Sequence, residues 1–179
     1  MVSQTYLSHY CAFWGNNLIK VENACSNLLR KDDRDFLQLI GIPSLLYVYD
    51  FSFDAGLIFS KEIRVRKERY FSLCHENVFD TYVRAGSGGI FLLIDDLDET
   101  EYCCSNLSSF FMMATKIYEM NAMIFQGDPD KDLYECSLKV DTSEATKLVE
   151  KARNDLLQID STIITSYENI WLRQVDIRF

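Results

Sequence analysis

The spacing of apolar side chains changes along the chain from helical to extended and back again, and these changes predict the order of its elements. Near the start, an aromatic segment over residues 6–14 predicts a short helix, residues 15–17 a break, and residues 18–29 a second helical stretch. The next helix has clearer ends, because Asp32 or Asp33 can cap it and Gly41 followed by Pro43 stops it. Its predicted inner stripe consists of Phe36, Leu37 and Ile40.

The middle of the chain is rich in aromatic and β-branched residues at extended spacing. Residues 45–53 and 57–59 predict a hairpin that turns at residues 54–56, and Ile63 and Val65 alternate with arginines as in a half-exposed strand. We expect residues 70–73 to continue the sheet and residues 90–94 to form its central strand. Residues 102–104 predict a further strand, with Cys103 and Cys104 on opposite faces.

Helical spacing returns in the last part of the chain. A helix that starts near Asn106 or Ser108 has apolar side chains at helical intervals as far as residue 118. Asp141 and Glu144 resemble a capping box that opens another helix. The inner face predicted for that helix consists of Ala145, Leu148, Val149, Ala152 and Leu156. Residues 161–179 predict a last helix laid against the core.

Together these elements predict an α+β fold with a mixed or largely antiparallel β-sheet flanked by helices. A chain of 179 residues fits one domain of ordinary size. The sequence shows no internal repeat and no low-complexity linker that would divide it. We therefore expect a single domain over residues 1–179.

Charge narrows the range of partners. Lysine and arginine number 18 against 27 aspartates and glutamates, a formal net charge of −9. Such a chain repels nucleic-acid phosphates and anionic lipid headgroups, so we expect neither nucleic acid nor membrane as a direct partner, and a basic protein is the natural complement. The first residues lack the pattern of a signal peptide and no apolar run is long enough to span a bilayer, which predicts residence in the cytoplasm.

Few residues are arranged for chemistry. The six cysteines form no CxxC pair, so we interpret them as reduced structural thiols rather than a zinc site. His9 and His75 are the two histidines, and Cys74-His75-Glu76 is the one local cluster. Because adjacent side chains on a strand or helix diverge, we expect His75 to have a surface or packing role. The sequence therefore predicts no catalytic residue, no cofactor and no metal.

An acidic turn follows the predicted central strand. Its carboxylates could chelate calcium or magnesium, but their spacing does not match an EF-hand loop. A solvated hairpin tip is the simpler interpretation, and an acidic surface for docking a protein partner is the functional one. The candidate partner-binding residues are Asp95, Asp96, Asp98, Glu99 and Glu101.

Two other motifs have structural interpretations. Residues 86–89 (Gly-Ser-Gly-Gly) precede a strand rather than a helix, so they predict a tight turn and not a phosphate cradle. A basic stretch is interrupted by Glu62 and Glu68, which is typical of a solvated strand face. Its cations are Lys61, Arg64, Arg66, Lys67 and Arg69.

The order of several short motifs resembles the SUKH superfamily. Residues 36–43 (Phe-Leu-Gln-Leu-Ile-Gly-Ile-Pro) resemble the element in which a helix ends before the sheet of that superfamily. Residues 86–95 resemble its Gly-containing strand entry, and residues 105–111 (Ser-Asn-Leu-Ser-Ser-Phe-Phe) its following helix, with Asn and Ser in shuffled positions. Asp160 and Trp171 are similar to residues that mark the closing helices of its fourth subgroup.

The resemblance implies a function without catalysis. Known members are mostly bacterial immunity proteins that neutralise a polymorphic or contact-dependent toxin by direct binding, and fungal relatives are interaction modules. It implies a SUKH-like domain that binds a cognate basic toxin, such as a nuclease. The alternatives are a regulatory interaction module without a toxin and, less favoured, a metal-dependent hydrolase that uses the turn from Asp95 to Glu101.

Overall fold

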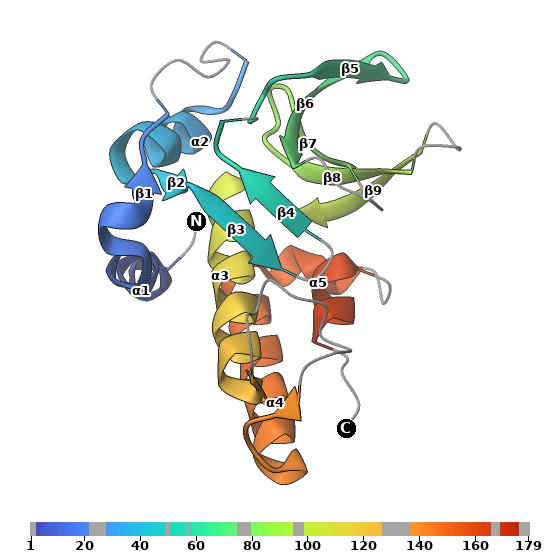
Figure 1. The fold of residues 1–179 in the computed structure, drawn as a ribbon. Helices are drawn as coiled ribbons and strands as arrows, with labels where there is room; N and C mark the ends of the chain where they lie inside the picture. Colours follow the sequence, from blue (N-terminus) through green and yellow to red (C-terminus); the bar gives the residue numbers. More distant parts are fainter. Residues whose placement is uncertain are drawn as a thin grey trace.

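The structure, a computed structural model, describes residues 3–21, 28–48, 51–56, 58–74, 80–94, 99–126, 137–165 and 169–175. It confirms the α+β fold: helices pack beside an antiparallel sheet (Figure 1). Within the described part, no helix has the length and apolar character needed to cross a membrane.

The main sheet has five strands in the order β5-β6-β7-β8-β9, and every neighbouring pair is antiparallel. The predicted central strand is β8, which lies inside the sheet, while β7 occupies the middle. Each strand follows its neighbour in the chain, so short connections suffice. The strands are β5 (Glu62–Val65), β6 (Glu68–Cys74), β7 (Asp80–Arg84), β8 (Ile90–Ile94) and β9 (Glu99–Cys104).

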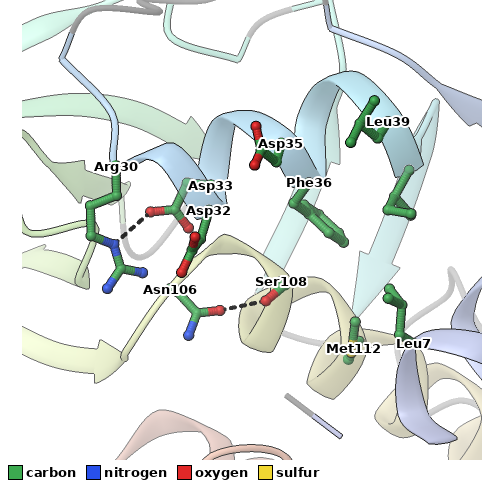
Figure 2. Close-up of a pocket in the computed structure, with 11 residues that line it drawn as sticks. Leu7, Arg30, Asp32, Asp33, Asp35, Phe36, Leu39, Asn106, Ser108 and Met112 are labelled. Carbon is green, nitrogen blue, oxygen red and sulfur yellow. Dashed lines mark hydrogen bonds and ion pairs between the residues drawn. The ribbon is translucent and has the colours of Figure 1, made fainter. Parts of the chain in front are cut away.

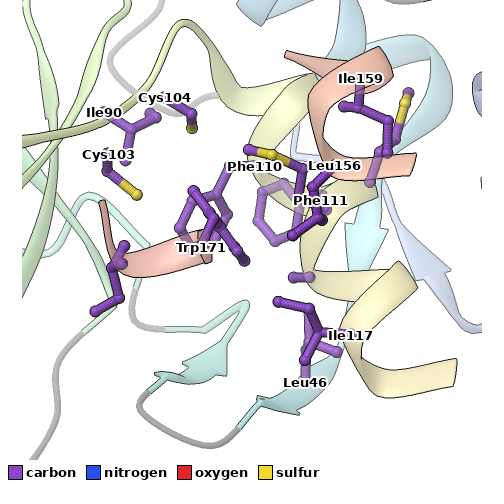
Figure 3. Packing of buried hydrophobic residues seen from close by; sticks show 14 of the residues in the cluster. Leu46, Ile90, Cys103, Cys104, Phe110, Phe111, Ile117, Leu156, Ile159 and Trp171 are labelled. Carbon is purple, nitrogen blue, oxygen red and sulfur yellow. The ribbon is translucent and has the colours of Figure 1, made fainter. Parts of the chain in front are cut away.

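Two long helices carry the main core. Asn106 caps α3 (Leu107–Ile124), its side chain accepting a hydrogen bond from Ser109 N at 2.8 Å. Asp141 caps α4 (Thr142–Ile159) in the same way through Glu144 N, as predicted. The core side chains of both helices belong to the same cluster as those of β8 and β9 (Figure 3). A smaller cluster around Val65, Tyr70 and Tyr82 covers the other face of the sheet.

The segment after α4 closes the core. It comprises a 3₁₀ turn, η4 (Ser161–Thr165), and α5 (Ile170–Gln174), so the predicted last helix is shorter than expected. Trp171 is fully buried, with its ring 5.1 Å from that of Phe110. Asp160 accepts a hydrogen bond from Ser105 N at 2.7 Å. Asp160 and Trp171 therefore hold this segment against Ser105, which follows β9, and against Phe110 of α3.

Two predictions in the first half of the chain are wrong in detail. The helix α1 (Gln4–Trp14) is confirmed, and the break after it forms the 3₁₀ turn η1 (Gly15–Asn17). The second helical stretch was predicted to begin at residue 18, but Leu18–Ile19 is a strand, β1, which pairs with β2 (Ile42–Pro43). The predicted hairpin forms between β3 (Leu45–Val48) and β4 (Phe51–Asp54), with Leu45 opposite Asp54. The second strand of the hairpin therefore ends at Asp54, and the turn at residues 55–56 follows this strand instead of joining the two. The remaining short pair is β10 (Phe125–Gln126) with β11 (Ser137–Leu138).

A bulge changes the expected alternation at the end of β9. Ile90 lies opposite Cys104 and Phe91 opposite Tyr102, so Cys103 is an extra residue between them. Both thiols consequently enter the main core, each fully buried, whereas strict alternation predicted opposite faces. Burial raises the pKa of the Cys104 thiol, which keeps it protonated.

Candidate functional site

A groove opens between residues 30–40 and the first turns of α3. Its walls are the N-terminal turns of α3, the helix α2 (Lys31–Asp35) with the turn that continues it, and Leu7 of α1 (Figure 2). The cavity has a volume of about 480 Å³. Polar side chains lie at one end, and Leu7, Leu39 and Met112 at the other (Figure 2).

Asp33 links the two walls at the polar end. Its carboxylate is 1% exposed; one oxygen accepts a hydrogen bond from Leu107 N at 3.0 Å and the other from Arg30 Nε at 3.0 Å. Arg30 also donates through Nη2 to Ser105 O at 3.3 Å. We predicted that Asp32 or Asp33 would cap its own helix, and this is wrong. The helix begins after Arg30 without a side-chain cap, and the Asp33 carboxylate binds the first turn of α3 instead.

The glycine-rich turn before β8 supports this ion pair. Gly88 has a φ of 71°, and a Cβ atom added there would overlap Arg30 Nε and Asp33 Oδ2. Glycine is therefore required at this position for two reasons: its backbone lies close to the ion pair, and its φ is positive. Residues 86–89 form a tight turn, as predicted, and this turn lies against the polar end of the groove.

The amides at the start of α3 are occupied by side chains of the protein. Asp33 accepts from Leu107 N, and the Asn106 side chain accepts both from Ser109 N at 2.8 Å and from the Ser108 hydroxyl at 2.7 Å. The Ser108 hydroxyl thus donates to an amide oxygen, which is not a base that would activate it. The hydrogen-bonding groups at this end of the groove therefore bind one another, which fixes the positions of their side chains.

The apolar end is formed by an unusual turn. Residues Phe36–Ile40 (η2) are π-helical, and Gly41 N closes the turn on Phe36 O at 2.9 Å. Gly41 has a φ of 95°, and a Cβ atom there would overlap Ile19 O of β1. Single π-turns are rare and occur frequently at functional sites. This one buries Phe36 and leaves Leu39 68% exposed at the rim.

The wall that carries this exposed leucine also carries carboxylates. Asp32 is exposed, and Asp35 is half-exposed with its carboxylate 2.6 Å from Lys31 Nζ. The lining holds three aspartates and one arginine, Arg30, which Asp33 already binds. The groove therefore combines an apolar floor with a negative rim, which suits an apolar side chain flanked by cations.

The acidic turn predicted from the sequence is described only at its end. Asp95, Asp96 and Asp98 lie outside the described residues, and Glu99 begins β9 opposite Ile94. Glu101 is 27% exposed, and its Oε2 lies 3.7 Å from Nη2 of Arg173 in α5. The structure does not bring Glu101 to the groove; it links β9 to α5.

The predicted histidine cluster also lies largely outside the described residues, which do not include His75 and Glu76. His9 lies on α1 and contacts Glu119 of α3, with Nε2 and Oε1 2.6 Å apart. Among the described residues, no group of three or more His, Cys, Asp or Glu is placed to hold a metal ion.

Sequence reasoning did not identify the groove. Phe36 and Leu39 lie in residues 36–43, and Ser108 lies in residues 105–111. Nothing in either segment shows that the two face each other. Comparison of the chain with models of protein families, with curated proteins and with solved structures gave no match.

Proposed function

We propose that this protein is a cytoplasmic immunity protein of SUKH type that binds and neutralises a basic toxin without catalysis. The observation that carries the proposal is the groove. Two of the segments whose order resembles that superfamily line it, residues 36–43 and residues 105–111. Its apolar end presents exposed Leu39, and its polar end presents exposed Asp32 (Figure 2).

The chemistry of the groove supports a protein partner. An exposed leucine above an apolar floor offers a pocket in which an anchoring side chain can be desolvated, as binding hot spots require. The aspartates at its rim, in a chain of net charge −9, attract a cationic surface and repel an anionic one. A toxin with a basic cleft, such as a nuclease, has the complementary charge.

The test needs a candidate toxin, and a toxin domain encoded by a neighbouring gene would be the first choice. Co-expression should protect cells from that toxin, and the purified proteins should form a complex in a calorimetric titration. Leu39→Arg should weaken the complex at least tenfold, about 1.4 kcal/mol, because it fills the pocket and repels a basic partner. Ile164→Arg is the matched control, since Ile164 is exposed to nearly the same extent, 65% against 68%, on η4.

Two results would contradict the proposal. One is a complex that tolerates Leu39→Arg as well as Ile164→Arg, which would place the interface elsewhere. The other is the absence of both protection and binding. In the second case the alternative is a regulatory interaction module that uses the same groove. This alternative is supported if a pull-down recovers a partner that is not a toxin and if Leu39→Arg abolishes the recovery.

A further inference from the structure

Among the described strands, both outer strands of the main sheet pair on one side only. At the β9 edge, the Asn169 side chain donates to Tyr102 O at 3.1 Å and to Cys103 O at 3.0 Å. At the other edge, β5 pairs with β6 alone among the described strands. Open edges offer unpaired backbone groups to a further strand.

The hairpin register determines which residues of β5 face outwards. Arg66 and Lys67 have φ values of 48° and 76°, which define a two-residue turn of type I′. In such a hairpin Val65 and Glu68 exchange backbone hydrogen bonds, and the pairs then alternate along the ladder. Ser72 N donates to Lys61 O at 2.9 Å, in agreement with this alternation. The N–H and C=O groups of Glu62 and Arg64 therefore point away from β6.

The side chains of these two residues carry opposite charges on the same face. Glu62 binds Arg69 through both oxygens, at 2.8 and 2.9 Å. Arg64 lies directly opposite Arg69, and its side chain is 73% exposed with Nε 3.9 Å from Glu62 Oε1. Like charges directly opposite in a ladder are destabilising. A carboxylate placed on the outer side of Arg64 would offset this repulsion.

We propose that β5 pairs antiparallel with β5 of a second copy of this chain, about a twofold axis at Ile63. In that register Glu62 lies opposite Arg64 of the second copy, and Arg64 opposite Glu62 of the second copy. The backbone groups of Glu62 and Arg64 face outwards, so these two residue pairs form the hydrogen-bonded pairs between the copies. Ile63 of one copy lies opposite Ile63 of the other, between the two pairs. The edge is thus self-complementary in backbone pattern, in charge and in its apolar residue.

This inference does not depend on the proposed function, because the groove and β5 involve different elements. The net charge of −9 on each copy opposes association. We therefore expect a dimer that depends on protein concentration and forms best at salt near physiological strength, where charges beyond about 8 Å are screened.

Sedimentation equilibrium over a concentration series tests the dimer. The wild-type chain should dimerise, and Arg64→Pro should be monomeric, because it removes an outward N–H that β6 does not use. Arg64→Glu should also be monomeric, since it places Glu62 opposite a glutamate. Arg153→Glu, the same charge change at an exposed position on α4, is the control and should leave the dimer intact.

A mixing experiment tests the register itself. Glu62→Arg and Arg64→Glu should each be monomeric alone, whereas an equimolar mixture should form a heterodimer in which every Arg meets a Glu. Circular dichroism of each variant checks that the hairpin is folded, and Arg64→Glu keeps the Glu62–Arg69 pair intact. A wild-type chain that stays monomeric throughout overturns the proposal, as does a dimer that survives Arg64→Pro or Arg64→Glu.

Discussion

Asp33 shows that the role of one residue can depend on a partner far along the chain. An aspartate at the start of a helix normally accepts hydrogen bonds from the amides of that helix. Asp33 instead accepts from Leu107, 74 residues later, and from Arg30. It is almost fully buried, so its charge has to be compensated by these donors.

The first prediction is that Asp33→Asn lowers the free energy of unfolding by about 2 to 3 kcal/mol, because an amide accepts at only one end and opposes Arg30 Nε with a second donor. Denaturant unfolding measures it. Asp32→Asn makes the same chemical change at an exposed neighbour and should alter stability by no more than about 0.5 kcal/mol. Equal losses in the two variants would contradict the assigned role of Asp33.

The second prediction concerns the turn between β5 and β6, where Lys67 has a φ of 76°. Side chains other than glycine, asparagine and aspartate are strained in this conformation. Lys67→Gly should therefore raise the free energy of unfolding by about 1 kcal/mol, measured by denaturant unfolding. Lys20→Gly is the control, because Lys20 is also exposed but does not have a positive φ. This variant should lower the free energy of unfolding. Loss of stability in Lys67→Gly would contradict the assigned strain.

Among the elements, α1 packs its apolar side chains against the core and adds polar contacts to the same surface. Tyr10 donates to Gly41 O at 3.1 Å and Trp14 to the Thr115 hydroxyl at 2.8 Å. The Tyr6 hydroxyl donates to Asp155 Oδ1 at 2.9 Å and lies 2.8 Å from Gln158 Oε1, which joins α1 to α4. Burial raises the pKa of Tyr10 strongly, so its hydroxyl stays a donor. These contacts place Leu7 in the groove.

The third prediction follows from Tyr6, whose pKa is raised from 10.0 to about 12 by burial and then by the neighbouring Asp155 carboxylate. The folded state holds this proton more tightly than the unfolded state, so the stabilisation is complete below pH 10 and disappears as pH rises towards 12. Tyr6→Phe should lower stability by about 1 kcal/mol at neutral pH.

The same variant should show a shallower decline of stability between pH 10 and 12 than the wild-type chain, measured by denaturant unfolding at each pH. The two proteins share every other titratable group, so the difference between the two curves isolates Tyr6. Parallel curves would contradict the assigned shift.

At the scale of the whole molecule, the net charge of −9 acts over distances that single contacts do not reach. The fourth prediction is that the association rate with the basic toxin falls as ionic strength rises, measured by stopped flow. An Asp32→Asn, Asp35→Asn double variant should flatten this dependence more than neutralising Asp95, Asp96 and Asp98 together. The opposite order would place the steering surface on the acidic turn.

Local patterns along the sequence determined the fold class and most elements. Asn106 and Asp141 cap helices that begin at the next residue, and the strands of the main sheet alternate over a few positions. Such signals are readable because the interacting groups are neighbours in the chain. The charge balance and the motif order were also available from the sequence, and they led to the hypothesis of a non-catalytic binding protein.

Tertiary structure alone decided the features whose partners are distant. Leu18–Ile19 is a strand because Ile42–Pro43 lies beside it, and Asp33 turns away from its own helix because α3 presents unpaired amides. The groove and the open edge of β5 arise in the same way, from segments that meet only after folding. Local propensity is worth a fraction of a kcal/mol per residue, so burial and hydrogen bonding with distant segments override it.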